Sequence, residues 1–481
     1  MRKPRQRGER FDLVVVGLGS AGLAAARFAA NLGLRVAAVE QGPIGGDCLW
    51  TGCVPSKGLI ASARAAQGIR TAGTFGVEAG QPIVDGAAVF ARIRAIQRDI
   101  ADGPDSPAEL ARAGVTHITG TARLDSPTSV VVGERRIVAK YVLICAGSRP
   151  AVPPIPGLEE TGYLTSDTVW DLTVIPKRLA IIGAGAIGCE FGQAFARLGS
   201  QVTILEAAPH ILALEDPALT DLLTSSLTND GVSLVTGATI DRIEPAGGAR
   251  VIHGQVGADH TTWTADAILV ATGRVANTPG LGLEAQGIAV GPGGVEVDDH
   301  MRTNCGTVVA AGDVTARPRF THVAAHDATI AVRNMFFPGS SEVPQVVPRC
   351  VFTDPELASV GLTVAQAQER HGAAAVRVHR TDLTRGDRGR TDGLYSGAIQ
   401  LVTVKGRLAG AGVLAPAAGE IVQSLALAIA QRMRLRDLAS VVHIYPTHSW
   451  EIALLASQAS YEHARRLRWL TRLRLPRRPN D

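Results

Sequence analysis

Residues 12–40 read DLVVVGLGSAGLAAARFAANLGLRVAAVE, and the architecture of the chain can be worked out from this stretch. The β-branched run Val14–Val16 predicts a short buried strand, and the alanine-rich segment after it predicts a helix. Three glycines at G-x-G-x-x-G spacing join the two, namely Gly17, Gly19 and Gly22. A second predicted strand, Arg35–Val39, ends in Glu40. This order is typical of a dinucleotide-binding β-α-β unit, in which the glycines admit a pyrophosphate and the acid accepts a ribose hydroxyl.

The same pattern returns at residues 178–206, which read RLAIIGAGAIGCEFGQAFARLGSQVTILE. Its glycines and terminal acid are Gly183, Gly185, Gly188 and Glu206. Gly183 follows Gly17 by 166 residues, and Glu206 follows Glu40 by the same 166. Two units of equal internal spacing predict two bound dinucleotides in one chain.

Segments between and after the two units predict further strands. His117–Leu124 and Ser129–Ile137 alternate in polarity, which predicts two strands of a small β-ribbon. A buried strand ends at Gly147, and the proline-rich stretch up to residue 157 indicates a crossing between domains. The second unit closes at 267–277 with a similar strand that runs to Gly273.

The last third of the chain differs in pattern. Residues 307–315 predict one more strand, which ends at Gly312 and Asp313. From about residue 346 the glycines become rarer. Alternation over Gly397–Val404 and helical spacing over Gly419–Met433 then indicate a separate α+β domain.

Composition and charge exclude several classes of protein. The 481 residues are 46% hydrophobic and 19% charged, which excludes a largely disordered chain. The formal net charge of +4 is uneven, because residues 1–10 carry +4, residues 465–481 carry +6 and the body between carries −6. A negative body argues against a nucleic-acid partner.

Six scattered cysteines do not form a secreted disulfide framework, and no apolar run is long enough to span a membrane. The run Phe11–Ala26 resembles a signal peptide, but it contains the fingerprint glycines and is interpreted as the first strand and helix. We therefore predict a cytoplasmic protein.

Two of the cysteines stand close together in residues 45–57, GGDCLWTGCVPSK. Cys48 and Cys53 are five residues apart, too far for a disulfide on a regular helix. They can pair only if Cys48 lies in an irregular first turn, which the surrounding glycines permit and Pro55 favours. A helix N-terminus also lowers a thiol pKa, so the pair should be reactive. The remaining cysteines are isolated and are expected to be buried small side chains, namely Cys145, Cys189, Cys305 and Cys350.

Together these motifs resemble the class I pyridine nucleotide-disulfide oxidoreductase family, which includes dihydrolipoamide dehydrogenase, glutathione reductase and mercuric reductase. Besides the two glycine-rich units and the cysteine motif, the matching stretches are CAGSRP (145–150), ATGRVAN (271–277), AAGDV (310–314) and VFTDPELASVG (351–361). The resemblance covers roughly residues 11–460. It implies an α/β fold with two Rossmann-like dinucleotide-binding domains and a C-terminal α+β dimerisation domain.

The expected domains are 11–152 (FAD-binding, first part), 153–279 (NAD-binding), 280–345 (return to the FAD or central domain), 346–464 (dimerisation) and 465–481 (basic tail). The resemblance implies a homodimer whose active site is shared between subunits. It also implies that the first unit, with Glu40, binds FAD and that Asp313 contacts the flavin's ribityl chain. The second unit would bind the nicotinamide cofactor.

The resemblance also assigns roles to residues of the reaction path. Lys57 and Glu190 match the family's ion pair beside the flavin, where a cation stabilises reduced flavin. Electrons would pass from nicotinamide to FAD and then to a Cys48–Cys53 disulfide. Cys53 would face the flavin, and Cys48 would attack the substrate. A carboxylate at Glu206, with no arginine in the residues that follow, favours NADH over NADPH.

The C-terminal motif departs from the family's disulfide reductases, which carry His-Pro-Thr and a Glu five residues after the His. Here Tyr445 stands in the His position, Trp450 stands in the Glu position, and Glu451 comes one residue late. Tyrosine has a pKa near 10 and is a poor base at neutral pH. His443 or His448 could replace the missing acid-base group, although the preferred interpretation of each is an ordinary interface or core histidine.

Mercuric reductases resemble this chain in having Tyr at that position, but they also carry two adjacent cysteines near the C-terminus. No cysteine follows Cys350 in this sequence. The acceptor is therefore left open among a soft metal ion such as Hg(II) or Cu(II), a quinone, and lipoamide or another small disulfide. Two alternatives also stay open, an NAD(P)H:quinone-type flavin reductase that does not use the disulfide and a flavoprotein redox sensor.

Two further features are read more simply. His322 and His326 have a spacing that can bind metal, but no third ligand has matching spacing, so no metal site is predicted. The arginine-rich stretch Arg465–Arg478 could be a basic amphipathic helix on anionic lipid. Because it is short and is interrupted by Pro476, a solvated, frayed tail is preferred.

Overall fold

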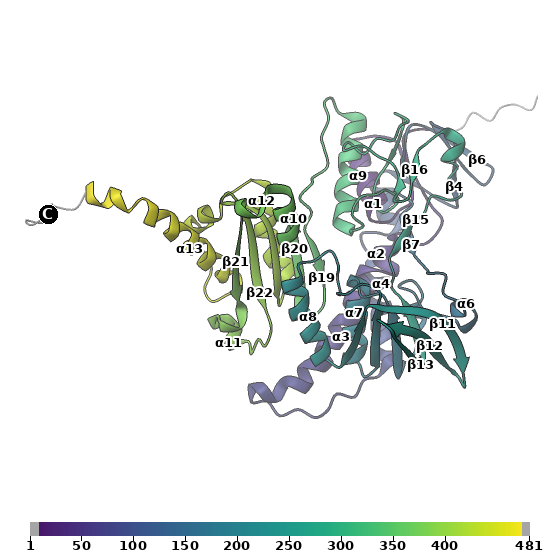
Figure 1. The fold of residues 1–481 in the computed structure, drawn as a ribbon. Coiled ribbons are helices and arrows are strands. Elements are labelled where there is room, and N and C mark those ends of the chain that lie inside the picture. The colour runs from purple at the N-terminus through teal and green to yellow at the C-terminus, as the bar shows by residue number, and fades with distance from the viewer. Residues whose placement is uncertain (1–8, 474–481) are drawn as a thin grey trace, which may run out of the picture.

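The computed structural model describes residues 9–473 and confirms the α/β class. Its first unit is a seven-stranded sheet in the order β3-β2-β1-β6-β5-β4, with β18 paired to β6. The strands are β1 (Glu9–Val16), β2 (Val36–Glu40), β3 (Val115–Thr119), β4 (Ala122–Ser126), β5 (Ser129–Val132), β6 (Arg135–Ile144) and β18 (Val308–Ala310). Helices α1 (Ser20–Asn31) and α9 (Thr321–Phe336) pack against each other on this sheet (Figure 1).

The ribbon expected from residues 117–137 is divided differently. Gly120, with φ +143°, separates β3 from β4, and β3 pairs in parallel with β2 in the main sheet. Gly133, with φ +57°, turns β5 into β6. The predicted strands His117–Leu124 and Ser129–Ile137 are therefore wrong as continuous strands, because a glycine breaks each of them.

The second unit is a four-stranded parallel sheet in the order β10-β9-β8-β14. Its strands and helices are β8 (Arg178–Ile182), α7 (Ala186–Arg197), β9 (Gln201–Glu206), α8 (Pro217–Asn229), β10 (Val232–Thr236) and β14 (Ala267–Val270). An antiparallel sheet of β11 (Ala238–Ala246), β12 (Ala249–Val256) and β13 (Asp259–Ala265) is inserted before β14. The chain enters and leaves this unit through the pair β7 (Ser148–Pro150) and β15 (Arg274–Ala276), next to the predicted boundaries at 152/153 and 279/280.

The C-terminal domain is a five-stranded antiparallel sheet in the order β19-β20-β23-β22-β21. The strands are β19 (Arg349–Val351), β20 (Glu356–Gly361), β21 (Val376–Asp382), β22 (Ala398–Val404) and β23 (Arg407–Ala415). The helices are α10 (Val364–His371), α11 (Asp387–Thr391), α12 (Ala418–Ala430) and α13 (Trp450–Arg466). The predicted helix 419–433 corresponds to α12, which ends three residues earlier.

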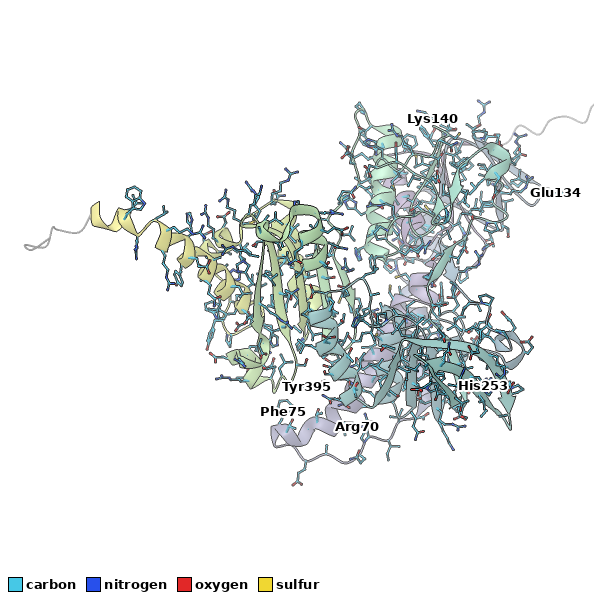
Figure 2. The ribbon with its side chains drawn as sticks, in the orientation of Figure 1. Arg70, Phe75, Glu134, Lys140, His253 and Tyr395 are labelled. Atoms are coloured by element: carbon cyan, nitrogen blue, oxygen red, sulfur yellow. The ribbon has the colours of Figure 1, made fainter. Side chains whose placement is uncertain are left out.

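The helix α3 (Cys53–Thr71) links the three regions. Near its N-terminus it packs on α4 (Gly86–Asp102), and along its length it packs on α7 of the second unit. At its far end Arg70 donates to the carbonyl of Arg197. In the 3₁₀ helix η1 (Ala72–Phe75) that follows, Phe75 lies against Gly393 of the C-terminal domain, close to Tyr395 (Figure 2). One helix therefore carries Cys53 and contacts both other domains.

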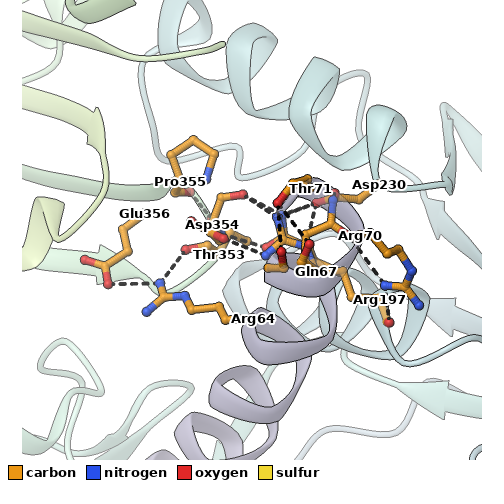
Figure 3. A network of polar contacts seen from close by, with 12 residues as sticks. Arg64, Gln67, Arg70, Thr71, Arg197, Asp230, Thr353, Asp354, Pro355 and Glu356 are labelled. Carbon is orange, nitrogen blue, oxygen red and sulfur yellow. Dashed lines mark hydrogen bonds and ion pairs between the residues drawn. The ribbon is translucent and has the colours of Figure 1, made fainter. Parts of the chain in front are cut away.

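A buried polar network fixes this junction (Figure 3). Arg197 is 4% exposed and pairs with Asp230 at 2.9 Å and Asp354 at 2.6 Å. Arg64 of α3 pairs with Glu356 of β20 at 3.2 Å. Arg197 and Asp230 are the fully buried pair, and removing one of them would leave an uncompensated charge, which typically costs about 3–5 kcal/mol of stability. The Arg64 side chain is 41% exposed, so its pair contributes about 1 kcal/mol or less. The network therefore strongly specifies how α3 sits between the domains.

The described part of the basic tail is helical, in contrast to the frayed tail that the sequence favoured. Helix α13 continues to Arg466 and is followed by the 3₁₀ helix η7 (Arg468–Leu473). Residues 474–481 of the predicted tail, and residues 1–8, lie outside the described residues. Within residues 9–473, no helix has the length and apolarity needed to cross a membrane.

Candidate active site

The turn between β1 and α1 is so close that only glycine fits at two positions. Gly17 has φ +96°, and a Cβ there would lie 2.3 Å from the carbonyl oxygen of Cys145. A Cβ on Gly22 would lie 1.8 Å from the carbonyl oxygen of Gly17. The helix is therefore held directly on the strand, as a pyrophosphate-binding turn requires.

Gly19 and Glu40 complete this cradle. Gly19 is the N-cap of α1 and makes no side-chain cap, so the first amides of the helix face the turn without a competing side chain. The Glu40 carboxylate accepts the N–H of Leu18 at 2.6 Å and that of Gly42 at 2.9 Å. It is thereby fixed beside the glycine turn, where a carboxylate can accept ribose hydroxyls. These residues fit a dinucleotide such as FAD.

The second unit repeats this geometry. Gly183 has φ +105°, and a Cβ there would lie 2.6 Å from the carbonyl oxygen of Ala271. A Cβ on Gly188 would lie 2.0 Å from the carbonyl oxygen of Gly183. The Glu206 carboxylate accepts the N–H of Ala184 at 2.6 Å, as Glu40 accepts that of Leu18. The second cradle therefore fits a second dinucleotide.

The remaining predicted cofactor residues lie around the two turns. Gly185 caps α7 without a side-chain hydrogen bond, as Gly19 caps α1. Gly147 and Gly273 have φ +69° and +122°, in the region that favours glycine. Asp313 accepts the hydroxyl of Ser148 at 2.8 Å, and burial raises the pKa of its carboxyl. Ser148 thus joins the end of the first sheet to the segment that follows β18.

The two paired cysteines lie in different helices. Cys48 belongs to the short helix α2 (Gly46–Trp50), and Cys53 is the first residue of α3. Gly45 and Gly46, with φ +107° and +57°, allow the sharp entry into α2. The sequence predicted an irregular first turn of a single helix, whereas the chain forms a separate turn of helix. Both side chains are free thiols in hydrogen-bond contact with each other.

This contact gives the two thiols opposite acidities. The hydrogen bond from Cys48 lowers the pKa of Cys53 to about 6, with further help from Thr321 and Lys57. The same hydrogen bond, together with burial, raises the pKa of Cys48. The Thr321 hydroxyl lies 3.3 Å from the Cys53 sulfur, at the first residue of α9. Near neutral pH the pair can therefore hold one proton, with the thiolate on Cys53.

Side chains from neighbouring elements hold the connection between the two cysteines. Gln97 of α4 donates to the carbonyls of Leu49 at 3.2 Å and Trp50 at 2.7 Å. The indole N–H of Trp170 donates to the carbonyl of Thr51 at 2.9 Å. These hydrogen bonds hold the loop in shape without a disulfide between Cys48 and Cys53.

Lys57 and Glu190 form the ion pair that the sequence predicted. The Lys57 Nζ lies 3.0 Å from Glu190 Oε2, although the residues are 133 positions apart. The structure adds a third member, because Glu190 Oε1 accepts the N–H of Phe352 at 3.0 Å and the Lys57 Nζ lies 4.1 Å from the centre of the Phe352 ring. The C-terminal domain thus contacts the ion pair directly.

Tyr445 lies on the C-terminal domain, where its hydroxyl donates to Asp387 of α11 at 2.9 Å. This contact raises the pKa of the tyrosine. Its ring meets the edge of Trp450 at 5.6 Å between centroids. These residues line a cleft of about 860 Å³ between α11 and the start of α13.

The histidines near Tyr445 have structural partners. His448 is largely buried, its Nε2 lies 3.2 Å from Asp392, and burial lowers its pKa. His443 lies 3.3 Å from the carbonyl of Leu438. Glu451 accepts the hydroxyl of Thr381 at 3.2 Å. Within residues 9–473 of one chain, the side chains of Tyr445 and His448 contact Asp387, Trp450 and Asp392 and not the cysteine pair.

Family models match most of the chain. The model "Pyridine nucleotide-disulphide oxidoreductase" matches residues 11–328, and the model of the family's dimerisation domain matches residues 347–456. The chain belongs to the pyridine nucleotide-disulphide oxidoreductase family. It is therefore an FAD-dependent oxidoreductase, and its dimerisation domain supports a homodimer.

Named relatives of this oxidoreductase fall into two groups. It is 37% identical over 452 residues to a mercuric reductase from Acidithiobacillus ferrooxidans, covering 92% of this chain and 81% of the relative. It is 34% identical over 462 residues to a dihydrolipoyl dehydrogenase from Chlamydia pneumoniae, covering 93% and 97%.

Among solved structures, the HOCl-induced flavoprotein disulfide reductase RclA from Escherichia coli matches with a TM-score of 0.83 and 28% identity, over 93% of this chain and 99% of that one. LpdA from Mycobacterium tuberculosis matches with a TM-score of 0.84 and 28% identity, over 94% and 99%. These structures share the fold of the oxidoreductase over nearly their whole length.

Sequence reasoning missed several residues of the site. Thr321, Gln97 and Phe352 contact the cysteine loop or the ion pair from distant parts of the chain. No motif marks the first two, whereas Phe352 lies within the recognised stretch 351–361. The expectation of buried thiols is correct for Cys145 and Cys189. It is wrong for Cys305 and Cys350, each of which is only half-buried.

Proposed function

We propose that the chain is an NADH-dependent reductase that passes electrons through FAD and the Cys48–Cys53 pair to a soft metal ion, Hg(II) or Cu(II). One observation carries this proposal: two hydrogen-bonded thiols of opposite acidity stand at the start of α3, beside the Lys57–Glu190 pair. A thiolate with a neighbouring thiol is both a soft-metal ligand and a two-electron donor.

The two cradles would hold the two cofactors. In the proposal, Gly17, Gly22 and Glu40 bind FAD with Asp313, and the Glu206 unit binds NADH. The chemistry that bound FAD would supply is the acceptance of a hydride from NADH and the transfer of two electrons to the cysteines. The chain's own part is to fix the ribose and pyrophosphate groups, to place Lys57 near the flavin and to keep a thiolate on Cys53.

The preference for NADH rests on Glu206. A carboxylate at that position accepts the adenosine 2′-hydroxyl and repels a 2′-phosphate. The next residues, Ala207, Ala208 and Pro209, offer no cation to offset that repulsion. An equal or higher kcat/KM with NADPH would contradict this part of the proposal.

The choice of a metal acceptor rests on Tyr445 and on the relatives. The disulfide reductases that the motifs resemble use a histidine base, whereas Tyr445 is held as a neutral phenol by Asp387. Mercuric reductases are prominent among the relatives, and structures of RclA include Cu(II) complexes. With Hg(II), the overall reaction is NADH + Hg(II) → NAD⁺ + Hg(0) + H⁺. With Cu(II), two ions each take one electron and become Cu(I).

The test is an anaerobic titration of the purified holoenzyme with NADH, followed by addition of Hg(II) or Cu(II). A long-wavelength band between thiolate and flavin is expected after two electrons, and its loss on adding the metal would follow from oxidation of the pair. Bleaching of the flavin without this band would exclude the cysteines from the path and favour a quinone reductase. Negligible turnover with every acceptor would instead favour a redox sensor.

Two wider expectations accompany the proposal. In a homodimer, Tyr445 of one subunit would complete the acceptor site of the other, as the resemblance implies. A cytoplasmic location, expected from the scattered cysteines, stays a prediction. Analytical ultracentrifugation and fractionation of the source cells test these two statements separately.

A further inference from the structure

The last helix extends away from the body of the molecule. The first part of α13 buries Ile452, Ala453, Leu455 and Ala456 in its own domain. Every residue from 464 to 470 is exposed, and Figure 1 shows the yellow end of α13 projecting outward. The end of the helix therefore presents a surface that the described chain does not cover.

This surface combines large apolar side chains with arginines. Tyr461, Leu467, Trp469 and Leu470 are 67%, 38%, 58% and 41% exposed. Arg465 and Arg466 end α13 just before Leu467, whereas Trp469 and Leu470 lie in η7, which follows at once. In sequence, residues 465–481 contain seven arginines and a single acid. Exposed tryptophan, tyrosine and leucine interleaved with arginine are typical of helices that lie in the interface of a membrane.

We propose that residues 461–470, the end of α13 together with the start of η7 and hereafter the terminal helix, bind an anionic lipid surface. The apolar side chains would enter the headgroup layer, and the arginines would pair with lipid phosphates. Charge complementarity favours this partner, because no acid interrupts the arginines of the terminal helix beyond Glu462. A nucleic acid would satisfy the arginines but would leave Leu467 and Leu470 in water.

The rest of the chain limits how it can meet the membrane. Residues 11–464 carry a net charge of −6, so the dinucleotide domains are repelled from an anionic surface. The terminal helix is then the point of attachment. In a homodimer two such helices would bind the same surface, which raises the apparent affinity without any new contact.

The test is co-sedimentation of the full-length holoenzyme with vesicles of phosphatidylcholine alone and of phosphatidylcholine mixed with phosphatidylglycerol. Binding is expected only to the mixed vesicles and should decrease as salt is raised. The double variant Arg465→Gln/Arg466→Gln should bind roughly 25-fold more weakly, since each arginine near the surface contributes about fivefold. The control Arg370→Gln/Arg407→Gln removes two exposed arginines elsewhere in the same domain and should bind as the unchanged protein does.

Trp469→Ala separates a membrane from other polyanions. It should weaken binding to the mixed vesicles while leaving retention on heparin, a soluble polyanion, unchanged. Equal binding of Trp469→Ala and the unchanged protein would overturn insertion at the interface. Binding to neutral vesicles, no binding to mixed vesicles, or an equal loss in the control variant would each overturn the proposal. Visible flavin absorbance reports that every variant is folded, independently of its electron acceptor.

Discussion

Two loops differ in how closely they follow the family: the cysteine loop, residues 48–53, and the Tyr445 loop, residues 441–449. Around Cys48 and Cys53 the cysteine motif, the Lys57–Glu190 ion pair and the glycine turns are all present, and the charge of Lys57 acts on Cys53. Around Tyr445 the histidine and the glutamate of the disulfide reductases are replaced, and the tyrosine is held by Asp387. The two loops lie in different domains of one chain.

The difference follows from what each loop must fit. The cysteine loop must match a cofactor whose shape and chemistry do not change, so its geometry is tightly constrained. In the proposed function the Tyr445 loop must match only the acceptor, so it can change when the acceptor changes. On this interpretation the chain keeps the family's electron input and has a different electron output.

The strongest test of the input side is Cys53→Ser. Removing the thiolate should lower metal-ion reduction by roughly a thousandfold or more, as loss of a reacting group does in other enzymes. The long-wavelength band should disappear with it. Cys305→Ser, which changes a half-buried thiol outside the site, is the matched control and should keep full activity. Undiminished turnover of Cys53→Ser would show that electrons leave by another route.

Tyr445→Phe tests the output side. It removes only the hydroxyl that Asp387 holds, so acceptor turnover should fall by about a hundredfold, within the usual range for one positioned proton donor. Reduction of the flavin by NADH should be unchanged, because within residues 9–473 of one chain the Tyr445 side chain contacts Asp387 and Trp450 and not Lys57, Glu190 or the two cofactor cradles. Tyr395→Phe is the control, since Tyr395 lines the same cleft without a contact to Asp387. Slower flavin reduction in Tyr445→Phe would contradict the separation of the two loops.

The fold and the input side were largely predictable, because short-range rules apply to them. Only glycine fits at Gly17 and Gly22, because a Cβ there would lie 2.3 Å and 1.8 Å from a backbone carbonyl oxygen, and such positions are visible as a motif. Lys57 and Glu190 were identified through resemblance, since no local pattern places residues 133 positions apart in contact.

The rest depended on tertiary contacts that leave no local signal. The loop clamp by Gln97 and the contact of Asp387 with Tyr445 come from surface-like polar residues. Alternating polarity across Gly120 and Gly133 predicts continuous strands, but each glycine takes a positive φ and ends the strand. The short length of the arginine-rich stretch and Pro476 predict a frayed tail, whereas residues 465–473 are helical in the structure.

Acidification should reversibly protonate the Cys53 thiolate and so remove its interaction with the flavin. The hydrogen bond from Cys48 lowers the pKa of Cys53 to about 6, so the thiolate is present above that pH and is lost as the pH falls through it. The long-wavelength band of the two-electron-reduced enzyme should therefore fall about tenfold for each pH unit well below the pKa. A spectroscopic titration measures this directly. A midpoint near the ordinary thiol pKa would show that the contacts of Cys48, Thr321 and Lys57 do not act on Cys53.

Phe352→Leu gives the smallest expected effect. It tests whether the C-terminal domain, through Phe352, supports the Lys57–Glu190 pair and thereby the reduction of the flavin. Leucine keeps the apolar volume and the N–H that binds Glu190, but it removes the ring 4.1 Å from the Lys57 ammonium. A partly exposed cation–π contact contributes about 0.5–1 kcal/mol, which corresponds to a two- to fivefold slower reduction of the flavin by NADH. Rapid mixing measures this rate, and Phe337→Leu, a half-exposed phenylalanine at the end of α9, is the control. If flavin reduction is unchanged while acceptor turnover falls, Phe352 serves the output side, and the C-terminal domain does not support the ion pair.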